Sequence, residues 1–315
     1  MEAGEETEEV FYPEKPEERK KNNPIIQSAA SLILFVGAYY LFFDTDLSFI
    51  YVLLVVLFIH EMGHFIAMKA FNYQDVKMFF IPLMGAMVTG QKRQISQVQQ
   101  SIILLAGPVP GLIIGLVMLY LAGRWDDNTM SVTASMFLFI NGFNLLPITP
   151  MDGGRLIGTL FFSSKDIVQM IFMAISAIAM AVIAVYLKAY LLLILPAFLA
   201  LQAMGLLRHQ KIRKELDQSE LDYQQPFDEM SNETYWRVRE VLVRSISTLK
   251  DVPGKPYRIS AKAQQIIAHV KAISMPPPIK AITWKSKLAF LLVWVFFIVM
   301  PLLMAAWIYS WAQSL

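Results

Sequence analysis

The stretch that decides the fold is residues 47–64, LSFIYVLLVVLFIHEMGH, where a long uncharged run ends in two histidines and a carboxylate. A run of this kind is typical of a helix that crosses a membrane. On such a helix His60 and His64 lie one above the other, so both imidazoles can bind one metal ion. Glu61 is turned about 100° from His60 around the helix and can reach a metal-bound water as general base. Because ionisable groups at membrane depth are costly to bury, their presence indicates function.

Composition places the chain among membrane proteins. Of its 315 residues, 56% are hydrophobic, which exceeds the roughly 45–50% of soluble domains. The net charge of +2 gives no reason to expect a nucleic-acid partner, and we expect none. Cysteine is absent, so disulfides and thiolate ligands are excluded, and any zinc must be held by histidine and carboxylate.

The apolar stretches predict an all-α fold: a polytopic membrane helix bundle of about seven spans, with a short membrane-associated β segment and a small helical cytoplasmic insert. The expected spans are residues 25–43, 47–71, 101–122, 132–147, 167–187, 189–207 and 288–312. The predicted domains are a disordered cytoplasmic tail (1–24), a transmembrane core (25–207), the insert (208–286) and a C-terminal transmembrane helix (287–315).

The basic residues set the expected orientation, because cytoplasmic loops carry an excess of Lys and Arg. With the N-terminus inside, the outer loops hold only Arg124 and Lys188 among the basic residues. We therefore expect an integral membrane protein with a cytoplasmic N-terminus and with His60 and His64 towards the cytoplasmic side. Residues 1–24 lack the apolar core of a signal peptide. Together with the absence of cysteine, this favours a bacterial cytoplasmic membrane.

The insert is the soluble stretch of domain size. Its first residues, 208–222, are highly charged and are expected to continue the sixth span as a helix. Residues 232–251, NETYWRVREVLVRSISTLKD, have apolar side chains at helical spacing and predict an amphipathic helix. Those apolar residues are Trp236, Val238, Val241, Leu242, Ile246 and Leu249.

A catalytic zinc site takes three protein ligands, so a third must join His60 and His64. His209 and His269 lie in the soluble insert. A better candidate is Asp152 in residues 141–155, NGFNLLPITPMDGGR, where prolines end the fourth span and two glycines allow a sharp turn. This turn would deliver Asp152 at a depth similar to that of His64. A helix N-cap is the alternative role, since Asp is common there, but the unsatisfied histidine pair favours a ligand.

Two motifs together, HEMGH (60–64) and N-x-x-P-x-x-P-x-D-G-G (144–154), resemble those of the site-2 protease family of intramembrane zinc metalloproteases. The resemblance covers about residues 47–165. It implies one zinc ion per chain held by His60, His64 and Asp152, with Glu61 as base and proton shuttle. It also implies that Asn144 lies near the catalytic centre and holds the substrate or the developing oxyanion. An interhelical hydrogen bond is the alternative role for Asn144.

The resemblance implies a reaction as well. A zinc-activated water, with Glu61 as general base, would hydrolyse peptide bonds within or near the transmembrane helix of single-span membrane proteins, in regulated intramembrane proteolysis. Residues 77–91, KMFFIPLMGAMVTGQ, are comparable to a family segment whose membrane-embedded strands pair with an unwound substrate; an amphipathic loop is the alternative. Residues 106–108, Ala-Gly-Pro, are similar to a further family element, but the usual later Asn is missing.

Two other functions stay open at this point. A non-catalytic membrane scaffold of the same fold would have no need to keep the base Glu61. A metal-ion transporter often shows internal repeats and ligands on several helices at the membrane midplane, and neither is apparent in this sequence. The expected partners are transmembrane substrates and membrane lipids, and the oligomeric state is open.

Overall fold

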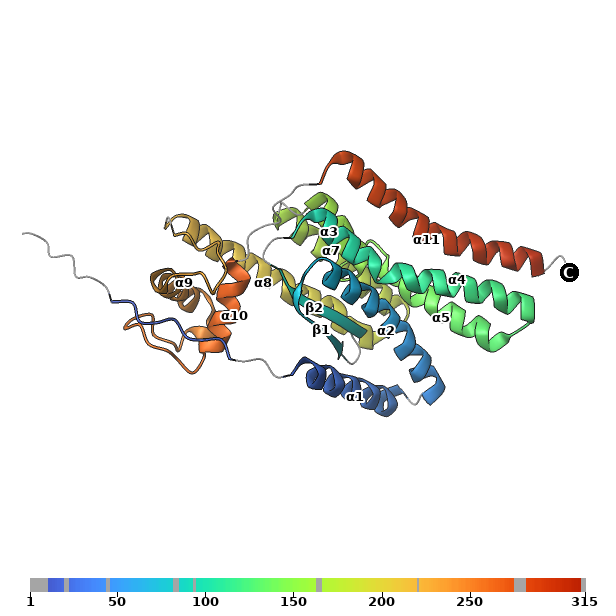
Figure 1. The fold of residues 1–315 in the computed structure, drawn as a ribbon, viewed down its shortest axis with the longest axis horizontal. Helices are drawn as coiled ribbons and strands as arrows, with labels where there is room; N and C mark the ends of the chain where they lie inside the picture. Colours follow the sequence, from blue (N-terminus) through green and yellow to red (C-terminus); the bar gives the residue numbers. More distant parts are fainter. Residues whose placement is uncertain are drawn as a thin grey trace, which may run out of the picture. The chain divides into compact units, whose positions relative to one another are not determined.

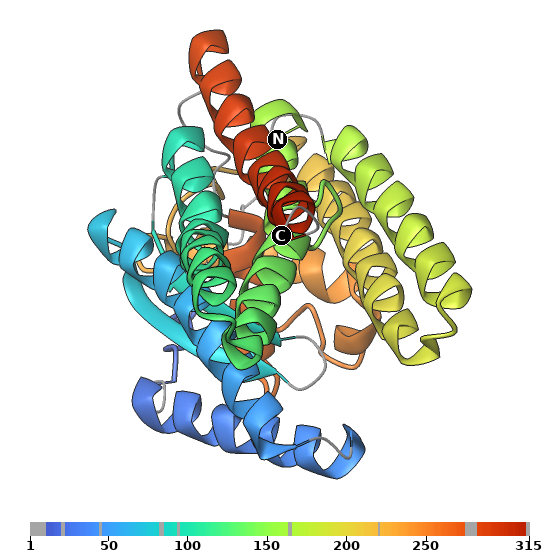
Figure 2. The same cartoon turned by 90° about the vertical axis from the view of Figure 1, so that its right-hand side faces the viewer.

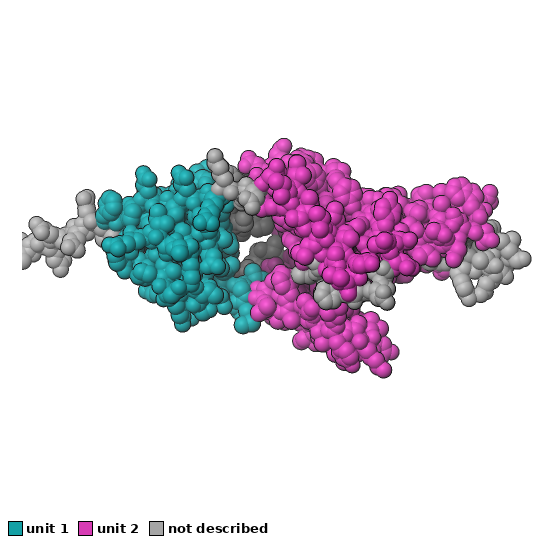
Figure 3. All heavy atoms as spheres, turned by 90° about the horizontal axis from the view of Figure 1, so that it is seen from below, with its two compact units in different colours: residues 1–20, 204–276 teal, residues 21–203, 277–315 magenta. Residues whose placement is uncertain are grey.

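The computed structural model of the chain describes residues 11–19, 23–43, 46–81, 85–92, 95–162, 166–219, 221–274 and 282–312. These residues are mostly helical, with one two-stranded sheet (Figure 1). The chain divides into two compact units, coloured separately in Figure 3. Unit 1 comprises Met1–Lys20 and Met204–Pro276, and unit 2 comprises Lys21–Ala203 and Pro277–Leu315.

Unit 2 contains the long apolar helices. They are α1 (Pro24–Phe43), α2 (Leu47–Ala70), α3 (Gln97–Ala106), α4 (Pro108–Trp125), α5 (Asn128–Asn144), α6 (Asp152–Ile157), α7 (Asp166–Tyr186) and α11 (Trp284–Ala312), and α8 (Ile194–Asp217) begins here. Two short turns, η1 (Gly158–Phe162) and η2 (Tyr190–Leu193), precede α7 and α8.

The number of membrane spans differs in part from the expected seven. Within the described residues, five helical stretches are long and apolar enough to cross a membrane. They are Leu47–Ala70, Gln97–Trp125, Ile167–Tyr186, Tyr190–Asp217 and Trp284–Met304. The two remaining predicted spans fall on α1, whose described apolar stretch Ile25–Leu41 is shorter, and on α5. The helical membrane fold is confirmed, and the count of seven stays a prediction.

Helix α2 is the element around which the functional site is built. It lies against α3, α4, α5 and both strands. Helices α4 and α5 lie side by side in Figures 1 and 2, joined by a tight turn in which the Asp127 carboxylate accepts a hydrogen bond from the Met130 amide. Buried leucines from α4, the end of α5 and α6 (Leu112, Leu145 and Leu156) form one apolar cluster. This packing holds the C-terminal end of α5 and the start of α6 in place beside α2.

The expected β segment is a hairpin. Strands β1 (Gln74–Ile81) and β2 (Gly85–Gln91) pair antiparallel, with Met78 opposite Val88. Met78 and Phe80 are buried and pack in one cluster with Phe35 of α1 and Leu57 of α2, since alternate side chains of a strand point to one face. Helix α1 also bonds to β1, because the Phe80 amide donates to the hydroxyl of Ser31 over 3.1 Å.

Unit 1 has a hydrophobic core of its own. It contains the second part of α8, α9 (Asn232–Ser245), the short turn η3 (Ser247–Leu249) and α10 (Ala263–Ser274). The apolar residues expected on the amphipathic helix are all buried here: Trp236, Val238, Val241, Leu242, Ile246 and Leu249. Helix α8 runs on through residue 217, so the charged start of the insert continues the preceding apolar helix.

The N-terminal segment differs from the expected disordered tail. Residues 1–10 and 20–22 lie outside the described residues, but residues 11–19 bind along unit 1. The ammonium of Lys15 donates to the carbonyls of Phe227 and Met230, each over 2.6 Å. The Trp236 indole donates to the carbonyl of Pro13 over 2.6 Å. These partners stand more than two hundred positions away in the chain, so local composition did not indicate them.

Candidate metal centre

His60 and His64 lie on one face of α2 and are both buried, with 3% and 8% of their surfaces exposed. Their rings meet edge to face, with centroids 4.9 Å apart, and their Nε2 atoms are 3.2 Å apart. The spacing of four residues on a helix produces this arrangement, as the sequence predicted. Both rings therefore direct the same nitrogen atom at a common point.

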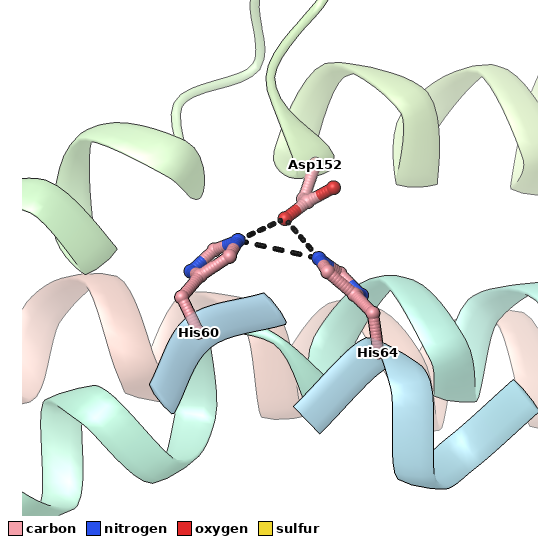
Figure 4. Close-up of side chains that lie close together, drawn as sticks. All are labelled: His60, His64 and Asp152. Carbon is pink, nitrogen blue, oxygen red and sulfur yellow. Dashed lines mark hydrogen bonds and ion pairs between the residues drawn. The ribbon is translucent and has the colours of Figure 1, made fainter. Parts of the chain in front are cut away.

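Asp152 completes this arrangement from α6. Its Oδ2 atom lies 3.1 Å from Nε2 of His60 and 3.1 Å from Nε2 of His64 (Figure 4). Asp152 is the first residue of α6, and Met151 occupies the N-cap position. The residue after Asp152 must be glycine for this turn to form, because a Cβ atom on Gly153 would overlap the carbonyl oxygen of Leu145. The chain thus returns close against the end of α5 and places the carboxylate over the two imidazoles.

The second nitrogen of each imidazole has its own partner. Nδ1 of His60 lies 2.9 Å from Oδ1 of Asn141, and Nδ1 of His64 lies 2.7 Å from the carbonyl oxygen of Ile103. Both partners accept hydrogen bonds, so each Nδ1 carries the proton and donates. In the neutral form that binds a metal ion, each Nε2 then presents its lone pair.

The donor set fits a zinc ion. Two imidazole Nε2 atoms and a carboxylate oxygen converge at 3.1–3.2 Å. With both imidazoles neutral, a shared cation offsets the repulsion between their lone pairs and the carboxylate. Ligand atoms about 2.0–2.2 Å from a tetrahedral zinc ion are about 3.3–3.6 Å apart, close to the observed triangle. Among the described residues, these three form the group that could hold a metal ion.

Glu61 lies next to the ligands and is also buried, with 5% of its surface exposed. Its Oε2 atom accepts no hydrogen bond from any residue that the structure describes. A buried carboxylate oxygen without a donor is costly, and such groups are found where chemistry requires them. Glu61 is thus buried beside the three converging side chains, and its role as a base stays a prediction.

Two glycines let the helices approach closely enough to form this site. A Cβ atom on Gly63 of α2 would overlap the carbonyl oxygen of Ala106 at the end of α3. A Cβ atom on Gly107, between α3 and α4, would overlap the imidazole of His64. The glycines of the HEMGH and Ala-Gly-Pro motifs therefore have a steric role at the crossing of α2 with α3 and α4.

The remaining predicted residues make other contacts. Asn144 is half-buried, and its side-chain amide donates to the carbonyl of Ile140 within α5 over 2.9 Å. His209 and His269, the other conceivable ligands, lie together in unit 1 with ring centroids 6.2 Å apart. Asn141, which bonds to His60, was not predicted. The only signal for it was a polar residue within an apolar helical stretch.

These features define a class of protein: a membrane helix bundle that holds a buried His-His-Asp centre with a glutamate beside it, as in a metalloprotease.

The comparisons with known proteins agree with this class. The model of peptidase family M50 matches residues 48–124. Over 115 residues, 34% of this chain and 33% of the relative, the chain is 32% identical to a zinc metalloprotease of Methanocaldococcus jannaschii. Over 117 residues, 35% of this chain and 38% of the relative, it is 28% identical to stage IV sporulation protein FB of Bacillus subtilis.

The resemblance to the site-2 protease family that the two motifs indicated is confirmed over this part of the chain. Among solved structures, a site-2 protease from Methanocaldococcus jannaschii has a TM-score of 0.41 and 21% identity, covering 57% of this chain and 87% of that one. The chain spans about a third of the length of the curated relatives it matches. The matched family segment ends before Asp152, so the third ligand rests on the geometry of the site.

Proposed function

We propose that this chain is a zinc-dependent intramembrane endopeptidase that hydrolyses peptide bonds within or near the transmembrane helix of single-span membrane proteins. The observation that carries the proposal is the convergence of Nε2 of His60, Nε2 of His64 and Oδ2 of Asp152, with the buried Glu61 beside them. His60 and His64 lie on a helix long and apolar enough to cross a membrane, and a second such stretch, Gln97–Trp125, packs against it. The biological process would be regulated intramembrane proteolysis.

Each residue of the centre has a distinct role in the reaction. His60, His64 and Asp152 would hold one zinc ion per chain. When bound, the ion supplies Lewis acidity, which lowers the pKa of water and polarises a carbonyl group. Glu61 takes the proton of the attacking water at its free Oε2 atom and returns it to the nitrogen of the leaving amine. Burial of these side chains keeps competing bulk water away from the scissile bond.

Asn144 would contact the substrate. One of its two side-chain N–H groups donates to Ile140, and the amide has a second N–H group to offer. A carbonyl oxygen that gains negative charge during hydrolysis is stabilised by such a donor. Its half-buried position is consistent with access for a substrate. This role is inferred from the family resemblance and from the second N–H group together.

The substrate would bind in an extended conformation beside β1 and β2. A helix hides its amide carbons, whereas an extended segment can add to the edge of a sheet. The hairpin follows α2 after three residues, and Val88 of β2 packs in one cluster with Phe65 of α2, the residue after His64. The sheet therefore lies near the helix that carries the metal ligands.

We further propose that the N-terminus is cytoplasmic and that the active centre faces the cytoplasmic side of a bacterial cytoplasmic membrane. The distribution of Lys and Arg supports this orientation. Membrane lipids and single-span substrates would then be the partners of the chain.

The function is tested by Glu61→Gln in the purified full-length protein. The variant should bind zinc at the same stoichiometry as the parent. It should cleave a single-span membrane substrate about 10²–10⁴-fold more slowly or not at all, because the general base is lost. Mass spectrometry of released peptides and elemental analysis of zinc provide the two readouts. Glu233→Gln, at an exposed position of α9, is the matched control.

Unchanged cleavage in Glu61→Gln would end the assignment. Zinc binding without cleavage in the parent would favour a scaffold, and zinc flux into vesicles that Glu61→Gln leaves intact would favour a transporter.

A further inference from the structure

We propose that Asn141, seated against Gly111, is a positioning residue that fixes the tautomer and ring orientation of His60. This inference rests on the proposed zinc centre. Asn141 lies on α5, one turn before its C-terminal end, and is fully buried. Its side chain reaches α2, where Oδ1 lies 2.9 Å from Nδ1 of His60.

The orientation of the Asn141 amide follows from its second contact. Nδ2 of Asn141 donates to the carbonyl oxygen of Phe137 over 2.8 Å. A carbonyl oxygen only accepts, so the nitrogen of the amide must face Phe137 and the oxygen must face His60. Since Oδ1 also only accepts, Nδ1 of His60 carries the proton. In neutral His60 the lone pair is then on Nε2, directed at Asp152 and His64.

The side-chain amide of Asn141 packs against Gly111 on α4. A Cβ atom at residue 111 would overlap the side-chain amide of Asn141, with Oδ1 only 2.6 Å away. One helical turn earlier, Gly107 makes the same kind of room for the imidazole of His64. The segment Gly-Pro-Val-Pro-Gly of residues 107–111 thus offers two recesses at a spacing of four, one for a ligand and one for the residue that orients a ligand.

Within this segment the chain lacks the later Asn that is usual in the family it resembles. Here the amide arrives at Gly111 from α5, the neighbouring helix. The lack of a Cβ atom at Gly111 is what makes room for this polar group from the neighbouring helix.

The two metal-binding histidines are oriented by different means. His64 bonds to the backbone carbonyl of Ile103, which side-chain substitution cannot remove. His60 depends on the side chain of Asn141. Partners of this kind, bonded to the second nitrogen of a metal-binding histidine, typically change metal affinity or activity by about 10–100-fold when removed. A substitution at Asn141 should therefore act on His60 without removing a ligand.

The test is a set of zinc affinities, measured by chelator competition in the full-length protein in detergent. Asn141→Ala should lower zinc affinity about 10–100-fold, because His60 loses its acceptor. Gly111→Ala should do the same, because it displaces the amide. The double variant should be no worse than Asn141→Ala alone, since the added Cβ then has no amide to displace. Ser135→Ala removes a similar bond to the carbonyl four residues earlier on α5, at an exposed site, and should leave zinc affinity unchanged.

Asn141→Asp and Asn141→Leu separate orientation from packing. Asp keeps an oxygen acceptor for His60 and should retain zinc affinity within a few-fold, whereas Leu fills a comparable volume without an acceptor and should lose about 10–100-fold. The visible absorption of the cobalt-substituted protein should change with Leu and not with Asp. The comparison of zinc affinity between Asn141→Asp and Asn141→Leu tests the inference even if Asn141→Ala fails to fold.

The inference is overturned if Asn141→Leu binds zinc as tightly as the parent, or if Gly111→Ala and Asn141→Ala weaken zinc binding additively. A parent protein that binds no zinc would instead contradict the proposed function itself.

Discussion

The four histidines of the chain form two pairs, and the pairs differ in what surrounds them. In unit 2, His60 and His64 meet edge to face with ring centroids 4.9 Å apart. In unit 1, His209 and His269 also meet edge to face, with centroids 6.2 Å apart. The first pair shares the Asp152 carboxylate. The second lies near Arg208, which together with burial lowers the pKa of His269.

Two neighbouring imidazoles are therefore not sufficient to form a metal centre. The first pair has an anion to balance a cation and a separate acceptor for each Nδ1, so both Nε2 lone pairs face one point. Near the second pair, a guanidinium and burial both favour neutral histidine and oppose a bound cation. A metal site is recognised by the groups that orient and neutralise the ligands, more than by the histidines.

The largest expected effect comes from removing the ligands of the first pair. His60→Ala, His64→Ala and Asp152→Ala should each abolish stoichiometric zinc binding and reduce substrate cleavage below detection, because a catalytic zinc needs three protein ligands. His209→Ala and His269→Ala should leave the zinc content at that of the parent. Elemental analysis after gel filtration measures both groups of variants.

Loss of zinc in His209→Ala or His269→Ala, with zinc retained in His60→Ala, would place the metal site at the second histidine pair and contradict this account.

A smaller effect is expected from the glycines that make room for the first pair. Gly63→Ala and Gly107→Ala introduce a Cβ that overlaps the Ala106 carbonyl and the His64 ring respectively. Overpacking of this kind typically costs about 1–3 kcal/mol. Thermal unfolding of the detergent-solubilised protein should show lower stability, and Gly107→Ala should also weaken zinc binding. Gly205→Ala is the matched control: it lies four residues before His209, and a Cβ there meets no atom within 4 Å.

If Gly107→Ala and Gly205→Ala have equal effects on zinc binding, the close packing of Gly107 against His64 does not contribute to zinc affinity.

The smallest effect concerns the pH dependence of unit 1. Burial, and then Arg208, lower the pKa of His269 below its ordinary value of 6.5. On acidification through about that pH, the unfolded chain binds more protons than the folded chain. The stability contributed by neutral His269 is therefore fully present above this pH and is lost as the pH falls below it. His269→Gln should reduce the loss of protection of α10 between pH 7.5 and pH 5, measured by hydrogen exchange. An identical pH dependence in parent and variant would contradict this account of His269.

The sequence predicted those parts of the site that depend on spacing within one helix. His60, Glu61 and His64 follow from a spacing of four residues in an apolar run. Asp152 could be predicted less directly, because a ligand and an N-cap have the same local pattern. The structure separates these roles: Asp152 is the first residue of α6 and its Oδ2 atom faces both histidines.

The parts that could not be predicted depend on packing between distant segments. Asn141 contacts His60, which is 81 positions away, and a polar residue in an apolar helix does not reveal its partner. Asn144 was singled out by its motif instead, and its bond lies within its own helix. The segment around Lys15 likewise has the composition of a free tail, and only its binding to unit 1 gives it a fixed conformation.

The central claim is that one zinc ion lies between α2 and α6. Anomalous diffraction at the zinc absorption edge, on crystals of the full-length protein, tests it most directly. We predict one strong peak about 2.0–2.2 Å from Nε2 of His60, Nε2 of His64 and an oxygen of Asp152. A peak beside His209 and His269, or no peak near Asp152 in protein that contains zinc and cleaves its substrate, would contradict the account.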